Sequence, residues 1–141
     1  MKPLRETFRA WGHPNIRAGH STTVMITRDK SLSTRGDCIV AVRAEKGLRD
    51  LDDEIKDTIK RGASVSMVVE AAGLSFETKG RGSPELPLTH ASDMVARKSG
   101  YICGRTLMIG ADMVSSDMEP ELICILQDGE RQVDITIKAY L

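Results

Sequence analysis

The sequence contains little of what would mark a secreted or membrane-spanning protein. It has three cysteines, Cys38, Cys103 and Cys124, and no C-x-x-C pair, which is typical of reduced thiols in the cytoplasm rather than of a disulfide framework. Its longest wholly apolar runs, CIVAV and LICIL, have five residues, whereas a membrane helix needs about 20. The first residues, MKPLRETFRAWG, are charged from the second position onward, so we expect no signal peptide.

Aromatic residues and excess charge are also scarce. One Trp, two Tyr and two Phe occur among 141 residues, and 20 Lys and Arg balance 20 Asp and Glu. A nucleic-acid-binding protein usually has a basic surface and aromatic platforms for the bases, so nucleic acid is not an expected partner. Neither the G-x-x-x-x-G-K-[ST] nor the G-x-G-x-x-G phosphate loop occurs. What the sequence does have, 40% hydrophobic and 28% charged residues, predicts one globular domain spanning residues 1–141.

An internal repeat is the most informative pattern. The segment GDCIVAVRAEKGLRDL from Gly36 resembles GRTLMIGADMVSSDM from Gly104, which places equivalent residues 68 positions apart. Phe8 and Phe76 are separated by the same 68 positions, whereas His20 corresponds to a later histidine, in THASDMVARKS, after a shift of two. We therefore predict an internal duplication, with copy one at about residues 1–72 and copy two at about residues 73–141.

Each copy is predicted to form strand, strand, strand, helix and strand. Residues 64–70 and 132–141 alternate apolar and polar side chains, as half-buried strands do. Two tandem repeats of this kind give about eight strands and two short helices. They predict a mainly β (α+β) fold, a pseudo-twofold β-sandwich or barrel.

One helix is expected in each copy. In copy two, residues 117–128 predict a helix capped by Asp117 with Pro120 in its first turn, although a hairpin turning at Asp128 and Gly129 is the alternative. In copy one, Gly62 ends the helix, and the apolar stripe consists of Leu48, Leu51, Ile55 and Ile59.

The repeat also predicts a binding site. Basic side chains flank equivalent strands in the two copies, and a twofold axis would bring the loops that carry them together. Arg grips phosphate or carboxylate through its planar fork and Lys acts as a point charge. We therefore predict a binding module for a small anionic ligand, such as phosphate or carboxylate, or for a macromolecular partner. The predicted ligand-binding residues are His20, Arg28, Lys30, Arg35, His90, Arg97, Lys98 and Arg105.

Other interpretations stay open. The same cations can be solvated turn charges, or the chain can be a subunit of a homo-oligomer or larger assembly. A small enzyme would use Cys103 as nucleophile, Arg105 to lower its pKa and His90 as base. A metal would need His20 and His90 with Cys103 or Asp93, but no H-x-x-x-H or H-E-x-x-H spacing occurs. We predict no metal site, and the sequence identifies no cofactor.

Three segments resemble a known family. FRAWGHPNIRAGH, RGDCIVAVRAEKGLRDL and SDMVARKSGYICGRTLMIGAD together resemble the archaeal proteins grouped as domain of unknown function 371. The resemblance covers nearly the whole chain and implies a mainly-β, sandwich-like fold in an archaeal cytoplasm. It implies no activity and no catalytic residue. It also implies a second Gly-His-Pro in the latter half, where this chain reads GRGSPEL, so a symmetric role for His13 is not expected.

Overall fold

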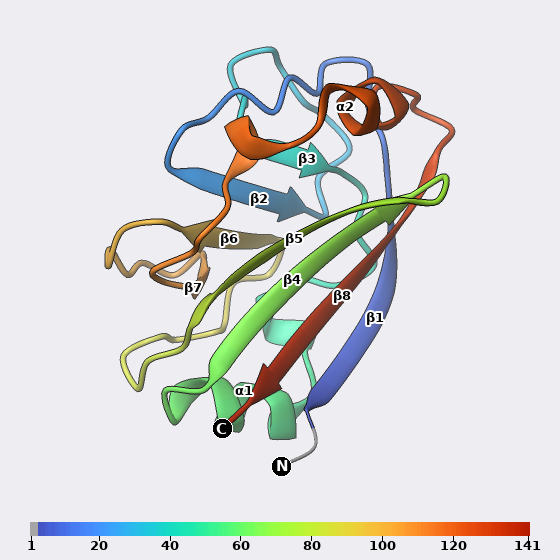
Figure 1. The fold of residues 1–141 in the computed structure, drawn as a ribbon. Coiled ribbons are helices and arrows are strands. Elements are labelled where there is room, and N and C mark those ends of the chain that lie inside the picture. Colours follow the sequence, from blue (N-terminus) through green and yellow to red (C-terminus); the bar gives the residue numbers. More distant parts are fainter. Residues whose placement is uncertain (1–2) are drawn as a thin grey trace.

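Eight strands and two short α-helices make up the protein, which a computed structural model describes over residues 3–141. Figure 1 shows α1 (Asp53–Lys60) at the end of the molecule where both termini lie and α2 (Pro120–Leu126) at the other end. A short 3-10 turn precedes each helix, η1 (Leu48–Asp50) and η2 (Ser115–Asp117). No helix within residues 3–141 has the length and apolar character needed to span a membrane. The strands are β1 (Leu4–Trp11), β2 (Thr23–Thr27), β3 (Ile39–Ala41), β4 (Ser64–Ala71), β5 (Leu74–Arg81), β6 (Asp93–Arg97), β7 (Thr106–Met108) and β8 (Gln132–Tyr140).

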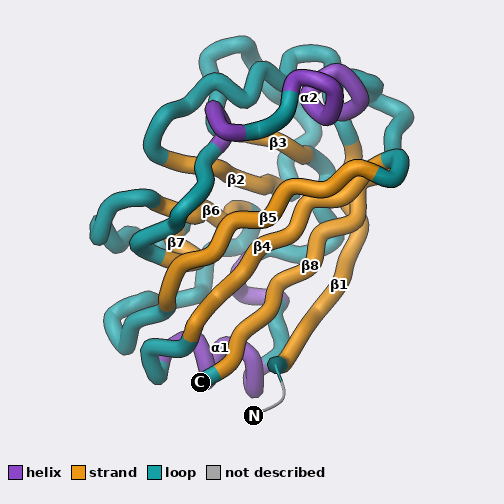
Figure 2. The backbone as a smooth tube through the Cα atoms, in the orientation of Figure 1, coloured by secondary structure: helices purple, strands orange, loops and turns teal. Residues whose placement is uncertain are grey.

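The strands form two four-stranded sheets (Figure 2). The long-strand sheet has the order β1-β8-β4-β5 and is antiparallel throughout, so the first strand of the chain pairs with the last. The short-strand sheet has the order β3-β2-β6-β7, with an antiparallel β2–β6 pair at its centre and a parallel pair on either side. Isolated bridges from Trp11 to Val42 and from Arg81 to Ile109 join the two sheets at both edges. The fold is therefore mainly β and sandwich-like, as predicted.

The core lies between the sheets because the long strands alternate inward apolar and outward polar side chains. The alternation predicted for residues 64–70 and 132–141 is confirmed by β4 and β8. The short strands β2 and β6 are buried almost throughout, so both of their faces are covered. Core residues with no more than 1% exposure include Val24, Ile26, Val65, Met67, Met94, Ile135 and Ile137.

The first helix is shorter than predicted. Leu48 lies in η1, and Leu51 has an extended backbone (φ −64°, ψ 148°), which prevents one continuous helix from running through both. Leu48, Leu51, Ile55 and Ile59 are nevertheless all buried, at 3% exposure or less. The apolar spacing therefore identified the inward side chains correctly but not the break before α1. Gly62 ends the helix as predicted, with a φ of +83° that glycine adopts without strain.

The second helix is confirmed within residues 117–128, and the hairpin alternative is wrong. Pro120 is the first residue of α2, where its missing N–H costs no helical hydrogen bond. The prediction that Asp117 caps this helix is wrong, because Glu119 is the residue that precedes it. Asp117 instead ends η2, and its Oδ2 accepts a hydrogen bond of 2.9 Å from the amide of Val114.

The two halves of the chain carry the same order of elements. β4 and β8 begin 68 positions apart, as predicted, but the other elements depart from this separation. β5 begins 70 positions after β1, and α2 begins 67 positions after α1. β3 begins at Ile39 and β7 at Thr106, again 67 positions apart, so the predicted equivalence of Gly36 and Gly104 is wrong by one residue. The loops between strands absorb these differences in length. A duplication with copies at residues 1–72 and 73–141 stays a prediction.

Candidate functional site

The two histidines predicted to share a site lie apart. His20 precedes β2 and His90 precedes β6, and these strands pair antiparallel, with Thr23 opposite Arg97. The histidines therefore stand at opposite ends of the β2–β6 pair, and the eight predicted residues do not converge on one pocket. Residues 3–141 also contain no group of three or more His, Cys, Asp or Glu side chains that could hold a metal ion.

Both histidines hold backbone turns. In each, Nδ1 accepts hydrogen bonds from the amides two and three residues later, at 3.2 and 3.2 Å for His20 and at 3.2 and 2.9 Å for His90. A ring nitrogen that accepts hydrogen bonds carries no proton, so the neutral rings carry it on Nε2. These contacts shape the turns that lead into β2 and β6, which is a structural role.

Ser83 fills the place of the second Gly-His-Pro histidine that the family resemblance implied. The amide of Asn15 donates to Nδ1 of His13 at 3.0 Å. The amide of Glu85 donates in the same way to Oγ of Ser83 at 3.2 Å. A serine hydroxyl therefore replaces the imidazole as hydrogen-bond acceptor, and the turn does not require a histidine.

Several of the predicted cations are already engaged within the protein. Nε of Arg105 donates to Oδ2 of the buried Asp93 at 2.8 Å. Arg28 approaches Asp50 at 3.5 Å. Arg97 donates to hydroxyl and thiol groups near β7. The other predicted cations are exposed and form no ion pair within residues 3–141: Lys30, Arg35 and Lys98.

The thiol of Cys103 is surrounded by hydrogen-bond donors. Its Sγ accepts from Nη2 of Arg97 at 3.1 Å, from the amide of Arg105 at 3.4 Å and from the hydroxyl of Thr106 at 3.6 Å. Burial raises the pKa of the Cys103 thiol, but these hydrogen bonds together outweigh burial and hold the pKa below its ordinary value. His90 is not among the partners of this sulfur within the described residues, so the structure does not form the base–thiol pair of the enzyme alternative.

Cys103 is expected to react with iodoacetamide several-fold faster than Cys38. The thiolate is the reactive form, and burial raises the pKa of Cys38 whereas that of Cys103 is lowered. Timed labelling near neutral pH, read by mass spectrometry, measures both rates in a Cys124→Ser background that lacks the exposed third thiol. Arg97→Leu should slow labelling of Cys103 because it removes one donor. Equal rates for the two thiols would contradict the prediction.

A groove that the sequence did not predict lies on the outer face of the long-strand sheet. It has a volume of about 590 Å³. One row of its floor crosses all four strands: Arg5 pairs with Lys138, Lys138 with Ser66, and Ser66 with Lys79. We call this site the basic groove. A second row lies two residues farther along the strands, toward α1, and consists of Tyr140, Ser64 and Arg81.

Cations outnumber carboxylates in the basic groove. Glu77 is the one carboxylate among its described lining residues, and it approaches Lys138 at 3.9 Å, near the upper limit for an ion pair. Arg5, Lys79 and Arg81 form no ion pair within residues 3–141. Positive charge therefore accumulates at this end of the sheet.

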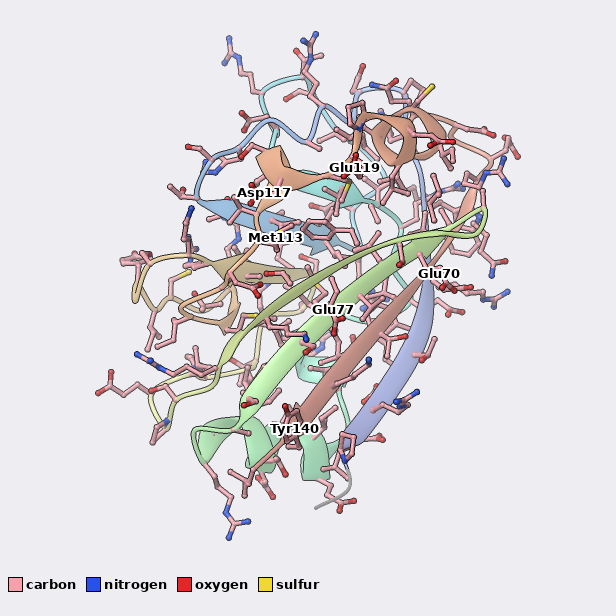
Figure 3. All side chains as sticks on the ribbon, in the orientation of Figure 1. Glu70, Glu77, Met113, Asp117, Glu119 and Tyr140 are labelled. Atoms are coloured by element: carbon pink, nitrogen blue, oxygen red, sulfur yellow. The ribbon has the colours of Figure 1, made fainter. Side chains whose placement is uncertain are left out.

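The opposite end of the same face is acidic. Glu70 of β4 lies directly across from Asp134 of β8, and the nearby Arg9 is neutralised by Glu45 at 2.9 Å. Figure 3 shows Glu70 and Tyr140 near the two ends of this face. The formal net charge of zero thus conceals a sheet that is positive at one end and negative at the other.

The signal for the basic groove is present in the sequence but weak. Lys79 and Arg81 occupy alternate positions, as do Lys138 and Tyr140, so each pair lies on one face of its strand. Arg5 comes near the start of the chain, however, and reaches the groove only because the first strand pairs with the last. Local patterns do not predict that pairing.

Comparison with known proteins identifies the family. Residues 8–140 match the family described as "Domain of unknown function (DUF371)". One curated relative, described as an uncharacterized protein of the archaeon Methanocaldococcus jannaschii, is 36% identical over 126 residues, which cover 89% of this chain and 93% of the relative. These matches confirm the resemblance seen in the sequence: the chain belongs to the DUF371 family.

Proposed function

We propose that the chain is a binding module for a small ligand with several negative charges, and that this ligand binds in the basic groove. The observation that carries the proposal is the presence of four cations and one carboxylate along a groove of about 590 Å³. Sites for small molecules usually have volumes of roughly 300–1,000 Å³. The reduced cysteines and the archaeal relative support an archaeal cytoplasmic setting.

The spacing of the cations favours a ligand with more than one anionic group. Neighbouring strands lie about 4.8 Å apart, so the backbones at Arg5 of β1 and Lys79 of β5, three strands over, are separated by about 14 Å. Lys79 and Arg81 lie about 7 Å apart along β5. One phosphate contacts only part of such an array, whereas two or three linked phosphates extend across it. The hydroxyls of Ser64 and Ser66 add neutral donors between the cations.

Lys79→Ala/Arg81→Ala is expected to weaken binding of inorganic tripolyphosphate at least tenfold. Each hydrogen bond to a charged group contributes about 1.5–3 kcal/mol, and the lower end applies to these exposed side chains. A loss of about 1.4 kcal/mol raises the dissociation constant tenfold. Isothermal titration calorimetry at low salt measures the dissociation constant, which should rise with ionic strength because salt screens the exposed charges.

The matched control is Arg17→Ala/Arg131→Ala, which removes two exposed positive charges outside the groove. It leaves the groove intact and should leave the affinity unchanged. If both double variants weaken binding equally, net charge rather than the basic groove attracts the anion. If the wild-type chain does not bind tripolyphosphate, the proposed function is wrong.

The loops predicted from sequence are a second candidate location for the same function. Arg28, Lys30 and Ser31 line a hollow of about 400 Å³ together with Asp29. Lys30→Ala/Arg35→Ala removes two cations that have no ionic partner in the described structure. A loss of affinity in this variant, with none in the groove variant, would place the anion at the loops.

A further inference from the structure

Tyr140 gives the basic groove an exposed aromatic ring, which phosphate binding does not require. It is the last residue of β8, its side chain lies on the outer face with Lys138, and 46% of its surface is exposed. It borders the basic groove and also a second pocket of about 420 Å³ between the end of β8 and α1. Figure 3 shows Tyr140 at the end of the sheet nearest α1. One aromatic ring therefore separates two cavities.

Within the described residues, both faces of the Tyr140 ring are free of arginine side chains, whereas an arginine lies over each of two other polar aromatic rings. The guanidinium of Arg43 lies over Trp11 at 5.1 Å, and that of Arg97 lies over Tyr101 at 5.0 Å. Within residues 3–141 no cation lies over the ring of Tyr140. An exposed aromatic face beside bound phosphates is a surface on which a flat ring can stack.

The second pocket suits a different part of a ligand than the basic groove does. Glu54 and Asp57 line it together with Arg61, so carboxylates outnumber cations there, and none of these three side chains forms an ion pair within the described residues. Carboxylates repel phosphate but accept hydrogen bonds from hydroxyl and amino groups. A ligand that extends past Tyr140 would therefore place its anionic end in the basic groove and an uncharged, polar end toward α1.

We propose that the ligand of the basic groove is a nucleoside di- or triphosphate, with its base stacked on Tyr140. This inference rests on the proposed function. Tyr140 lies opposite Ser64, and Ser64 lies opposite Arg81, so two strand spacings, about 10 Å, separate the backbones at the aromatic ring and the guanidinium. A ribose occupies the space above Ser64, between the stacked base and phosphates held by Lys79 and Arg81.

The test compares ATP with inorganic tripolyphosphate, both without divalent metal, by calorimetry. ATP should bind about tenfold more tightly, because stacking of one base on an aromatic side chain gives roughly that gain. Tyr140→Leu should abolish the difference by weakening ATP about tenfold while leaving tripolyphosphate unchanged. Tyr140→Phe should retain the preference for ATP. Lys79→Ala/Arg81→Ala should weaken both ligands.

Tripolyphosphate binding reports whether the groove of each variant is intact. If ATP and tripolyphosphate bind equally to the wild-type chain, the nucleotide inference fails and the proposed function stands. If Tyr140→Leu leaves ATP binding unchanged, or weakens both ligands equally, stacking on Tyr140 is excluded. If neither ligand binds the wild-type chain, the proposed function fails together with the inference.

Discussion

Gly82→Ala is expected to destabilise the fold by about 3 kcal/mol or more, a large effect for the addition of one methyl group. A Cβ at Gly82 would lie 1.9 Å from the carbonyl oxygen of Ile59 and 2.7 Å from its carbonyl carbon. Both are backbone atoms in the last turn of α1, and the amide of Gly82 also donates to the carbonyl of Ala63 at 2.8 Å. Neither partner can move without displacing the helix from the core.

Gly100→Ala is the matched control for this prediction. A Cβ at Gly100 would meet nothing within 4 Å, and its backbone is not left-handed, so the variant should be as stable as the wild type or slightly more. Urea unfolding gives the free energy of each variant. Equal midpoints for Gly82→Ala and Gly100→Ala would show that the chain does not pass this close to α1.

Glu6→Ala is expected to destabilise the fold by about 2 kcal/mol, because it removes a buried acceptor on which a backbone amide depends. The Glu6 side chain is 7% exposed and forms an ion pair with Lys46, whose side chain is 33% exposed. Its Oε1 also accepts a hydrogen bond of 2.9 Å from the amide of Asp52, the residue that precedes α1. The substitution therefore leaves an ammonium group and a backbone N–H without their acceptor, and urea unfolding measures the loss.

Glu45→Ala provides the comparison, since its ion pair with Arg9 is exposed to solvent and the variant should lose much less stability than Glu6→Ala.

The hydrogen bond from Lys46 to Glu6 raises the pKa of Lys46 above its ordinary value of 10.5. Stability from this shift is present below that value and is lost as the pH rises through the higher pKa of the folded protein. The wild type should therefore have a higher free energy of unfolding than Lys46→Met, and this difference should decrease only at strongly alkaline pH. A decrease near neutral pH would contradict this account.

The sequence predicts which helices and strands this fold contains better than it predicts the residues at which they begin and end. Alternation identifies β4 and β8 directly because each has one buried face. The break before α1 escapes prediction, since a 3-10 turn followed by a helix buries Leu48, Leu51 and Ile55 with the same spacing as one continuous helix. The predicted separation of 68 between the halves holds for β4 and β8 but is missed for the other elements for a similar reason. Loops of unequal length separate elements whose apolar patterns resemble one another.

The candidate site is harder to predict because it depends on pairing between distant strands. His20 and His90 occupy equivalent positions, but an antiparallel pair of strands places equivalent positions at opposite ends. Arg5 and Lys138 carry no motif in the sequence and become neighbours only through the β1–β8 ladder. Equivalence in sequence therefore indicates similar surroundings rather than proximity.

The two bridges between the sheets restrict how a polypeptide partner can bind. Trp11 and Val42 exchange both backbone hydrogen bonds at 2.8 Å, and Arg81 and Ile109 do so at 2.9 and 3.0 Å. A peptide that binds by β-augmentation needs an edge strand with a row of free N–H and C=O groups. In this fold the long edge strands are tied at one end, and the short ones offer only three residues each. Recognition of another protein would therefore rely on side chains displayed by the sheet faces, and the same arrangement protects the folded chain from intermolecular strand pairing.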